Sequence, residues 1–91
     1  MTNLGKTICL IKEKPGREIN KKHIEVNTIK LIPVRLRKYI KNINISVDKT
    51  NTARVVINHV PGVNLEKHII NNRYKLDLGY IHVLNKMKNT Q

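Results

Sequence analysis

The apolar residues of this chain include almost no aromatic side chains, and this restricts the kind of core it can build. Its 91 residues contain no Phe, no Trp and only three Tyr, which are Tyr39, Tyr74 and Tyr80. The core must therefore consist mainly of Ile, Leu and Val, and the β-branched residues among these favour strands. A chain of this length is expected to form one domain around one core. A sheet-containing domain is thus favoured over an all-helical bundle.

Apolar residues with helical spacing occur in two segments. In 34–43 they are Leu36, Tyr39, Ile40 and Ile43, and in 52–60 they are Ala53, Val56, Ile57 and Val60. Each set lies on one side of a helical wheel, which predicts an amphipathic helix in each segment. The second predicted helix has a capping residue in Asn51 or Thr52 and ends before Pro61-Gly62.

The rest of the chain contains alternating apolar segments and one ambiguous segment. We expect strands at residues 7–11, 43–47 and 63–66, a short helix within 18–32, a turn at Pro15-Gly16, a peripheral strand pair at 74–78 and 80–84, and a polar tail at 86–91. The predicted fold class is a small α+β domain of the order strand-helix-strand-helix-strand, with an antiparallel sheet backed by helices. Residues 1–66 form the predicted RNA-binding core, and residues 67–91 form a C-terminal extension on or beside it.

The charge of the chain indicates an anionic partner. Eighteen Lys and Arg face six Asp and Glu, which gives a net charge of +12 at pH 7. Residues 1–45 carry +8 of this charge and residues 46–91 carry +4. A domain of this size stays soluble with a smaller charge, so the excess favours nucleic acid as the partner. A membrane surface is disfavoured because the chain lacks the Trp and Phe that anchor interfacial helices.

Residues suited to catalysis or metal binding are scattered along the chain. His23, His59, His68 and His82 show no metal-ligand spacing with the single Cys9 and are expected on the surface. Cys9 lies in an apolar run, so we expect a buried, inert thiol. The acids are spread singly and offer no general acid-base pair. We therefore expect a protein that is not an enzyme and has no metal, no cofactor and no small-molecule substrate.

The predicted binding mode is contact between cations and RNA phosphates. The chain lacks the aromatic signature of a base-stacking RNA platform, so cationic loops and helices remain as the means of holding a folded RNA. The first candidate cluster comprises Lys12, Lys14, Gly16, Arg17, Lys21 and Lys22. The second comprises Arg35, Arg37, Lys38 and Lys41. Both lie in the more basic half of the chain.

Two short motifs resemble a known family. Residues 10–17, with the sequence Leu-Ile-Lys-Glu-Lys-Pro-Gly-Arg, resemble the first strand and Gly-Arg motif of the large-subunit ribosomal protein number thirty family. Residues 54–60, Arg-Val-Val-Ile-Asn-His-Val, resemble that family's second helix, although Val55 stands where the family favours Gly. The resemblance spans residues 6–66, with about nine extra residues in the first helical region. It implies a strand-helix-strand-helix-strand protein that contacts ribosomal RNA through Lys12, Lys14, Arg17 and the first helical region. Arg54 would contact RNA or fix the second helix.

These observations predict a structural constituent of the large ribosomal subunit. Its partners would be ribosomal RNA and neighbouring ribosomal proteins. A mitochondrial ribosome is favoured over a cytoplasmic one, because Ile, Lys and Asn, all with AT-rich codons, supply 38 of the 91 residues. Two alternatives remain open: a DNA-binding or nucleoid protein, and a non-enzymatic interaction module in another ribonucleoprotein assembly.

Overall fold

The computed structural model describes residues 5–76 and 78–84, which form one sheet and several helices. In chain order the elements are β1 (Gly5–Lys12), α1 (Lys21–Lys30), α2 (Val34–Arg37), β2 (Ile40–Val47), β3 (Thr52–His59), α3 (Leu65–Asn72), the 3-10 helix η1 (Arg73–Lys75) and β4 (Tyr80–Leu84). The predicted polar tail at 86–91 lies outside the described residues, as does Asp77 within the predicted strand 74–78.

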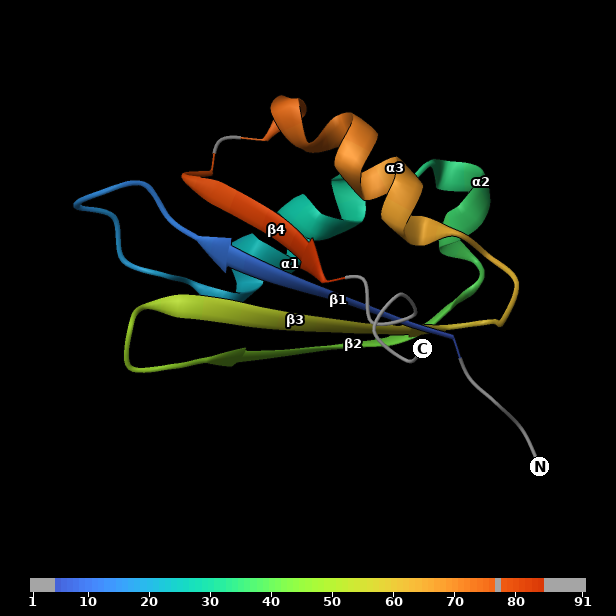
Figure 1. Cartoon of the computed structure of the whole chain (residues 1–91), viewed down its shortest axis with the longest axis horizontal. Coiled ribbons are helices and arrows are strands. Elements are labelled where there is room, and N and C mark those ends of the chain that lie inside the picture. The colour runs from blue at the N-terminus through green and yellow to red at the C-terminus, as the bar shows by residue number, and fades with distance from the viewer. Residues whose placement is uncertain (1–4, 77, 85–91) are drawn as a thin grey trace.

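Neighbouring strands of the sheet all run antiparallel, in the order β2-β3-β1-β4 (Figure 1). The strands β1 and β2, which α1 and α2 connect, are therefore parallel to each other, with β3 inserted between them. The second half repeats this pattern, because β3 and β4 are connected by α3 and η1 and lie on either side of β1. The chain is thus built from two interlocked split βαβ units.

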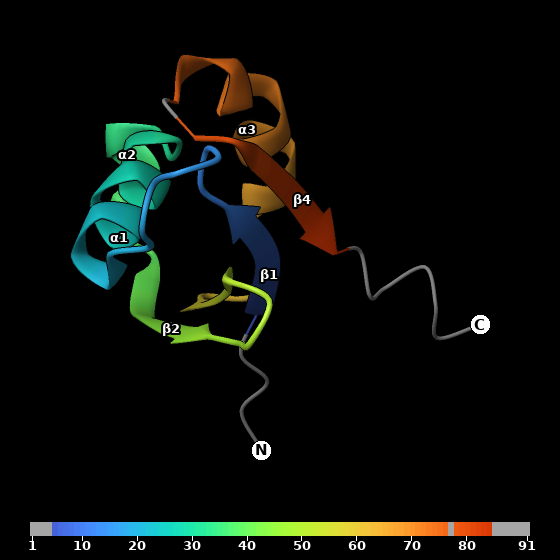
Figure 2. The same cartoon turned by 90° about the vertical axis from the view of Figure 1, so that its left-hand side faces the viewer.

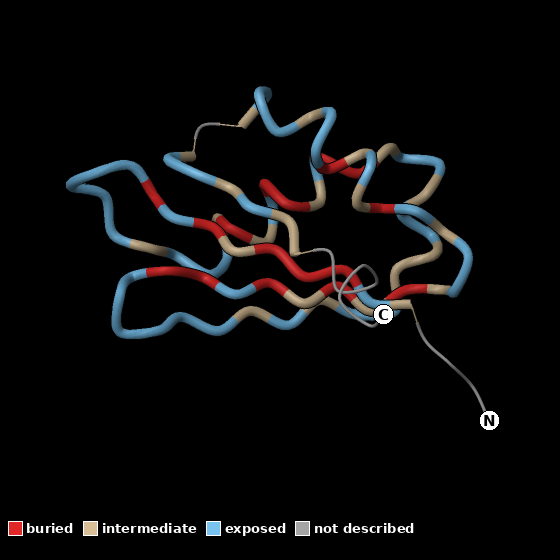
Figure 3. The backbone as a smooth tube through the Cα atoms, viewed as in Figure 1, coloured by how far each residue is buried: buried red, intermediate tan, exposed pale blue. Residues whose placement is uncertain are grey.

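The helices pack on one face of this sheet. Figure 2 shows α1, α2 and α3 on the same side, and Figure 3 shows buried residues along the strands and on the helices. The fully buried side chains include Cys9 and Ile11 of β1, Val55 and Ile57 of β3, Ile24 of α1, and Leu65 and Ile69 of α3. Because side chains alternate along a strand, the other residues of β1 and β3 point to the opposite face. None of the described helices covers that face.

The predicted fold class is confirmed: the chain is an α+β domain whose antiparallel sheet is backed by helices. The strand predictions at 7–11, 43–47 and 80–84 and the helix prediction within 18–32 are also confirmed. The turn at Pro15-Gly16 forms as predicted. The amide of Arg17 donates to the carbonyl of Lys14 at 3.0 Å, and Gly16 has a φ of 84°. A positive φ at this position of a turn favours glycine.

The helix predicted at 52–60 is wrong, because residues 52–59 form the central strand β3. The run Val55-Val56-Ile57 satisfies helical spacing through Val56 and Ile57, whereas the structure buries Val55 and Ile57. Val56 lies on the opposite face and is still half-buried between its strand neighbours Ile8 and Asn44. In a central strand that is apolar on both faces, polar and apolar residues no longer alternate along the sequence. The β-branched residues are then the remaining signal that favours a strand.

The helix predicted at 34–43 is one turn long, and β2 begins at Ile40. A β-bulge explains the helix-like spacing. Ile40 lies opposite His59 and Asn42 lies opposite Asn58, so Lys41 is an extra residue in β2. This insertion turns Ile40 and Ile43 toward the same side of the sheet, where both pack against the core. Two residues three positions apart can therefore share a face without a helix.

Further predictions are corrected in the second half of the chain. The strand predicted at 63–66 overlaps the start of α3, because Asn64 caps this helix by accepting from the amide of Lys67 at 3.1 Å. In the predicted strand 74–78, Tyr74 and Lys75 belong to η1 instead. The strand β4 is not part of a peripheral pair, since it forms an edge of the main sheet beside β1. The boundary expected at residue 66 falls inside α3, and Ile69 beyond it is fully buried in the core.

Candidate nucleic-acid interface

The face of the sheet opposite the helices, here called the outer face, is the first candidate site. Alternation and strand register define its members: Lys6, Ile8, Leu10 and Lys12 of β1, Asn42, Asn44 and Ser46 of β2, Thr52, Arg54, Val56 and Asn58 of β3, and Tyr80, His82 and Leu84 of β4. Among these strand positions there are three Lys or Arg side chains and no Asp or Glu.

The strand register arranges the outer face in rows across the sheet. Lys12 lies opposite Tyr80, and in the next row Leu10 lies between His82 and Arg54. Two rows further along, Lys6 lies opposite Asn58. Apolar Ile8, between Leu84 and Val56, separates the two polar ends of the face. The cations therefore lie near both ends of an apolar centre, and all three are exposed.

The nearby carboxylate of Asp48, in the turn between β2 and β3, is already engaged by backbone and hydroxyl donors. Its Oδ1 accepts from the Thr50 hydroxyl at 2.7 Å, the Thr50 amide at 2.9 Å and the Thr52 amide at 3.1 Å. The hydrogen bond from the Thr50 side chain, then that from the Thr52 backbone, hold the pKa of Asp48 below its ordinary value, and the charge of Lys12 adds to this. Asp48 thus serves to order the turn.

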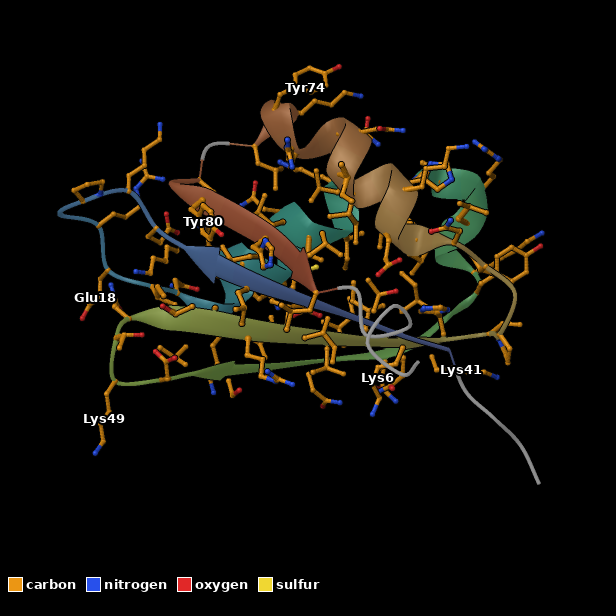
Figure 4. The ribbon with its side chains drawn as sticks, viewed as in Figure 1. Lys6, Glu18, Lys41, Lys49, Tyr74 and Tyr80 are labelled. Atoms are coloured by element: carbon orange, nitrogen blue, oxygen red, sulfur yellow. The ribbon has the colours of Figure 1, made fainter. Side chains whose placement is uncertain are left out.

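Tyr80 and His82 project from the same side of β4. Their ring centroids are 6.3 Å apart and the ring planes differ by 8°. Both side chains are exposed, Tyr80 by 52%. Ile81 and Val83, which alternate with them, pack against the core instead. Figure 4 shows Tyr80 on β4 and Lys6 near the start of β1.

The first predicted cluster is divided by the structure. Lys12 belongs to the outer face, whereas Lys14 and Gly16 lie in the loop between β1 and α1. Arg17 is close to a carboxylate of its own loop, since its Nη1 atom is 3.4 Å from Oε1 of Glu13. Lys21 and Lys22 are exposed in the first turn of α1.

The second predicted cluster lies at the other end of the molecule, around α2 and the start of β2 (Figure 1). Arg35 is exposed on α2. Arg37 is tied to the fold, because its Nε donates to the carbonyl of Ile32 at 3.0 Å. The Lys38 ammonium lies 5.4 Å from the centroid of the Tyr39 ring, and Lys41 is the exposed bulge residue of β2. The two clusters therefore do not form one continuous surface.

Sequence reasoning did not assign Lys6, Tyr80 and His82 to the site. Their signal was the alternation in residues 80–84, which indicates a strand but not whether that strand joins the main sheet. Arg54, proposed from the family resemblance, is brought into the same face as Lys12 because β1 and β3 pair directly. The register of strands distant in sequence was required to assemble this set.

Two titratable side chains of the sheet, His59 and Cys9, are buried on the side that faces the helices. His59 is buried, and its Nε2 and Nδ1 atoms lie 2.9 Å from the Thr7 hydroxyl and the Val60 carbonyl. The expectation that every histidine lies on the surface is therefore wrong for His59. Cys9 is fully buried as predicted, and burial, then the charge of Glu66, raises the pKa of its thiol to about 12. Such a thiol is a poor nucleophile at neutral pH.

Within residues 5–76 and 78–84, no group of three or more His, Cys, Asp or Glu side chains is placed to hold a metal ion. None of the helices in this part of the chain is long and apolar enough to cross a membrane. No protein-family model matches the chain, and no curated protein shows significant similarity to it.

Proposed function

We propose that this protein binds RNA through the outer face of its sheet, as a non-catalytic component of a ribonucleoprotein particle. One observation carries the proposal: the face left uncovered by the described helices has Lys6, Lys12 and Arg54 at its strand positions and no acidic residue. This face belongs to a chain with a net charge of +12. Cations on a surface without opposing carboxylates attract the phosphates of RNA and release their condensed counterions.

The side chains of this face can contact both the phosphates and the nucleosides of a nucleic acid. The guanidinium of Arg54 can donate two parallel hydrogen bonds to one phosphate, and Lys12 supplies a second charge in the neighbouring row. The Oδ1 atom of Asn42 accepts from the side-chain amides of Asn58 at 2.8 Å and Asn44 at 3.2 Å. The second hydrogen of each amide can still donate to, and the oxygens of Asn44 and Asn58 can still accept from, the edges of bases or the 2′-hydroxyls of ribose. The face therefore offers phosphate contacts near both ends and neutral hydrogen-bonding groups on β2 and β3.

We propose the large ribosomal subunit as the particle, with ribosomal RNA and neighbouring ribosomal proteins as partners and the mitochondrial ribosome as the favoured location. This finer assignment rests on the first-strand and Gly-Arg motif of residues 10–17 and on the codon bias. The motif at residues 54–60 does not support it structurally, because 54–59 belong to β3 where the family resemblance implies a helix. Co-sedimentation of the native protein with a ribosomal subunit tests this assignment separately from RNA binding.

Two double variants that each remove two exposed charges test the RNA-binding face. Lys12→Ala with Arg54→Ala changes the outer face, and Lys21→Ala with Lys22→Ala changes the first turn of α1 on the helix side. Affinity for one structured RNA is measured by fluorescence anisotropy over a series of salt concentrations. We expect the outer-face variant to reduce the slope of log affinity against log salt by about 1.5, since each phosphate contact contributes about 0.7 to 0.9. The α1 variant should leave the slope nearly unchanged.

If the α1 variant reduced the slope more than the outer-face variant, the interface would lie on α1 and the assignment to the outer face would be overturned. A wild-type protein without measurable affinity for RNA at low salt would overturn the function itself. Duplex DNA is included as a competitor at equal phosphate concentration, because preferential binding to DNA would favour the nucleoid alternative over RNA.

A further inference from the structure

The pair of rings on β4 suggests which form of RNA the outer face binds. Tyr80 and His82 are two residues apart on an edge strand, so both rings project from the same face, and their planes are within 8° of parallel. Beyond this mutual stacking, neither ring has a hydrogen bond or an ion pair with any residue in the described part of the chain. Two exposed, nearly parallel π-faces are therefore available to a planar ligand.

These rings lie directly beside cations of the same face. Lys12 is opposite Tyr80 across the β1–β4 pair, while Leu10 lies between His82 and Arg54 in the adjacent row. A nucleotide placed on the rings can thus keep its phosphate near Lys12 or Arg54. Aromatic side chains that hold bases, combined with cations that follow the backbone, are the means by which proteins bind single strands.

We propose that the occupant of the outer face is a single-stranded RNA segment, with a base stacked on the Tyr80–His82 pair. This inference rests on the proposed function and names the form of RNA that it requires. Bases in an A-form duplex are stacked on each other and present no free faces to a sheet, whereas an unpaired base can unstack and lie on an aromatic ring. It also departs from the sequence-based expectation that the chain lacks a base-stacking platform and binds through cationic contacts to phosphates.

The test compares a single-stranded RNA of about 12 nucleotides, a length within the range that single-strand-binding folds occupy, with a duplex of the same sequence. Binding of both to wild type, Tyr80→Leu and Tyr80→Phe is measured by fluorescence anisotropy at several salt concentrations. We expect wild type to prefer the single strand, and Tyr80→Leu to weaken single-strand binding by about 5-fold to 100-fold. Tyr80→Phe keeps the ring and should retain the affinity.

A matched control is available in Tyr74. It is 78% exposed on η1, and Figure 4 shows it on the helix side of the molecule, away from the outer face. Tyr74→Leu removes the same kind of side chain and should leave RNA binding unchanged. The melting temperatures of all three variants verify that each is folded.

The salt series separates this inference from the proposed function. Tyr80→Leu removes no charge, so it should lower affinity at every salt concentration without changing the slope, whereas Lys12→Ala with Arg54→Ala should reduce the slope. The stacking inference would be overturned if wild type bound single strand and duplex with equal affinity, or if Tyr80→Leu bound the single strand as tightly as wild type does. If the slope still depended on Lys12 and Arg54, RNA binding by the outer face would stand. Failure of wild type to bind either form would overturn both.

Discussion

The Nδ1 atom of His23 lies 2.9 Å from Oε2 of Glu13, and this contact joins the first turn of α1 to the end of β1. The Glu13 side chain is fully buried, and its other oxygen is 3.4 Å from Nη1 of Arg17. A buried carboxylate requires such partners because its desolvation is expensive. The basic loop between β1 and α1 is therefore folded around an internal acid, and Arg17 has a structural role there.

Replacing the buried Glu13 should destabilise the protein. Glu13→Gln keeps the shape but removes the charge that His23 and Arg17 contact, and we expect a loss of about 1.5–3 kcal/mol in the free energy of unfolding. Glu18→Gln is the control, because Glu18 is exposed in the same loop. Urea denaturation at pH 7 gives both values. A Glu13→Gln protein as stable as Glu18→Gln would show that the buried contacts make no net contribution to stability.

Single substitutions in β3 should distinguish a strand from the helix that the sequence favours. In the strand, Val55 and Ile57 are fully buried among the helices, while Val56 is half-buried on the outer face. We expect Ile57→Ala to cost about 2–4 kcal/mol and Val55→Ala to cost more than Val56→Ala, because only the first two open cavities in the helix-packed core. Thermal unfolding of the three variants measures this order. A helix with Val56 and Ile57 on its inner side would reverse the order of the two Val variants.

The sequence predicted the class of the fold better than it predicted individual segments. Residues 7–11, 43–47 and 80–84 are recognisable as strands, since each is short and is rich in β-branched residues or shows alternation. The error at 52–60 has a physical origin in the position of β3, which has a strand on each side and apolar residues on both faces. The bulge at Lys41 produced the other false helix by placing Ile40 and Ile43 on one side. Neither the central position of β3 nor the bulge in β2 can be recognised from the sequence, because both depend on which strands pair.

The candidate site can be predicted only in part from the sequence, again because its assembly depends on strand pairing. The excess of cations is evident from composition, and the sequence indicates both Lys12 and Arg54 as candidate RNA contacts. Their proximity depends on the β1–β3 register, and the inclusion of Tyr80 and His82 depends on β4 pairing with β1 across some seventy residues of chain. Clusters judged from neighbours in sequence, such as Arg35 and Arg37, instead lie on a short helix at one end of the molecule.

Gly79 allows the segment before β4 to approach the end of β1. Its amide donates to the carbonyl of Lys12 at 3.0 Å, and a Cβ atom at this position would lie 2.6 Å from the Glu13 carbonyl oxygen. Gly79→Ala should therefore push β4 away from β1 at a cost of about 1–3 kcal/mol. Gly16→Ala is a useful comparison, because Gly16 has open space around it and would be strained only through its φ of 84°.

Hydrogen exchange of the β4 amides tells these two variants apart. Gly79→Ala should accelerate exchange in β4, where the pairing with β1 is disturbed, and Gly16→Ala should affect only the loop after β1. Unaltered protection of β4 in Gly79→Ala would mean that the sheet edge tolerates the added methyl group. In that case the close approach at Glu13 would not be needed to hold the Tyr80–His82 pair beside Lys12.

The thiol of Cys9 should make the stability of the protein depend on alkaline pH. Burial, then the nearby charge of Glu66, raises its pKa from the ordinary value of 9.0 to about 12 in the folded chain. The unfolded chain loses this proton at a lower pH, so the stabilising effect of the neutral buried thiol is complete below about pH 9 and is lost as the pH rises toward 12. The loss should be about 1.4 kcal/mol per pH unit within this window.

Lysines and tyrosines also titrate at these pH values, so the measurement must isolate Cys9. Cys9→Ala removes the thiol and retains every other titrating group. The difference in free energy of unfolding between wild type and Cys9→Ala should be constant from about pH 6 to 8 and should fall steadily above about pH 9, with wild type losing the more stability. A thiol-specific reagent should react with unfolded but not with folded wild type, because Cys9 is fully buried. A difference that stays constant up to about pH 10.5 would show that the thiol ionises as readily in the folded chain as in the unfolded one.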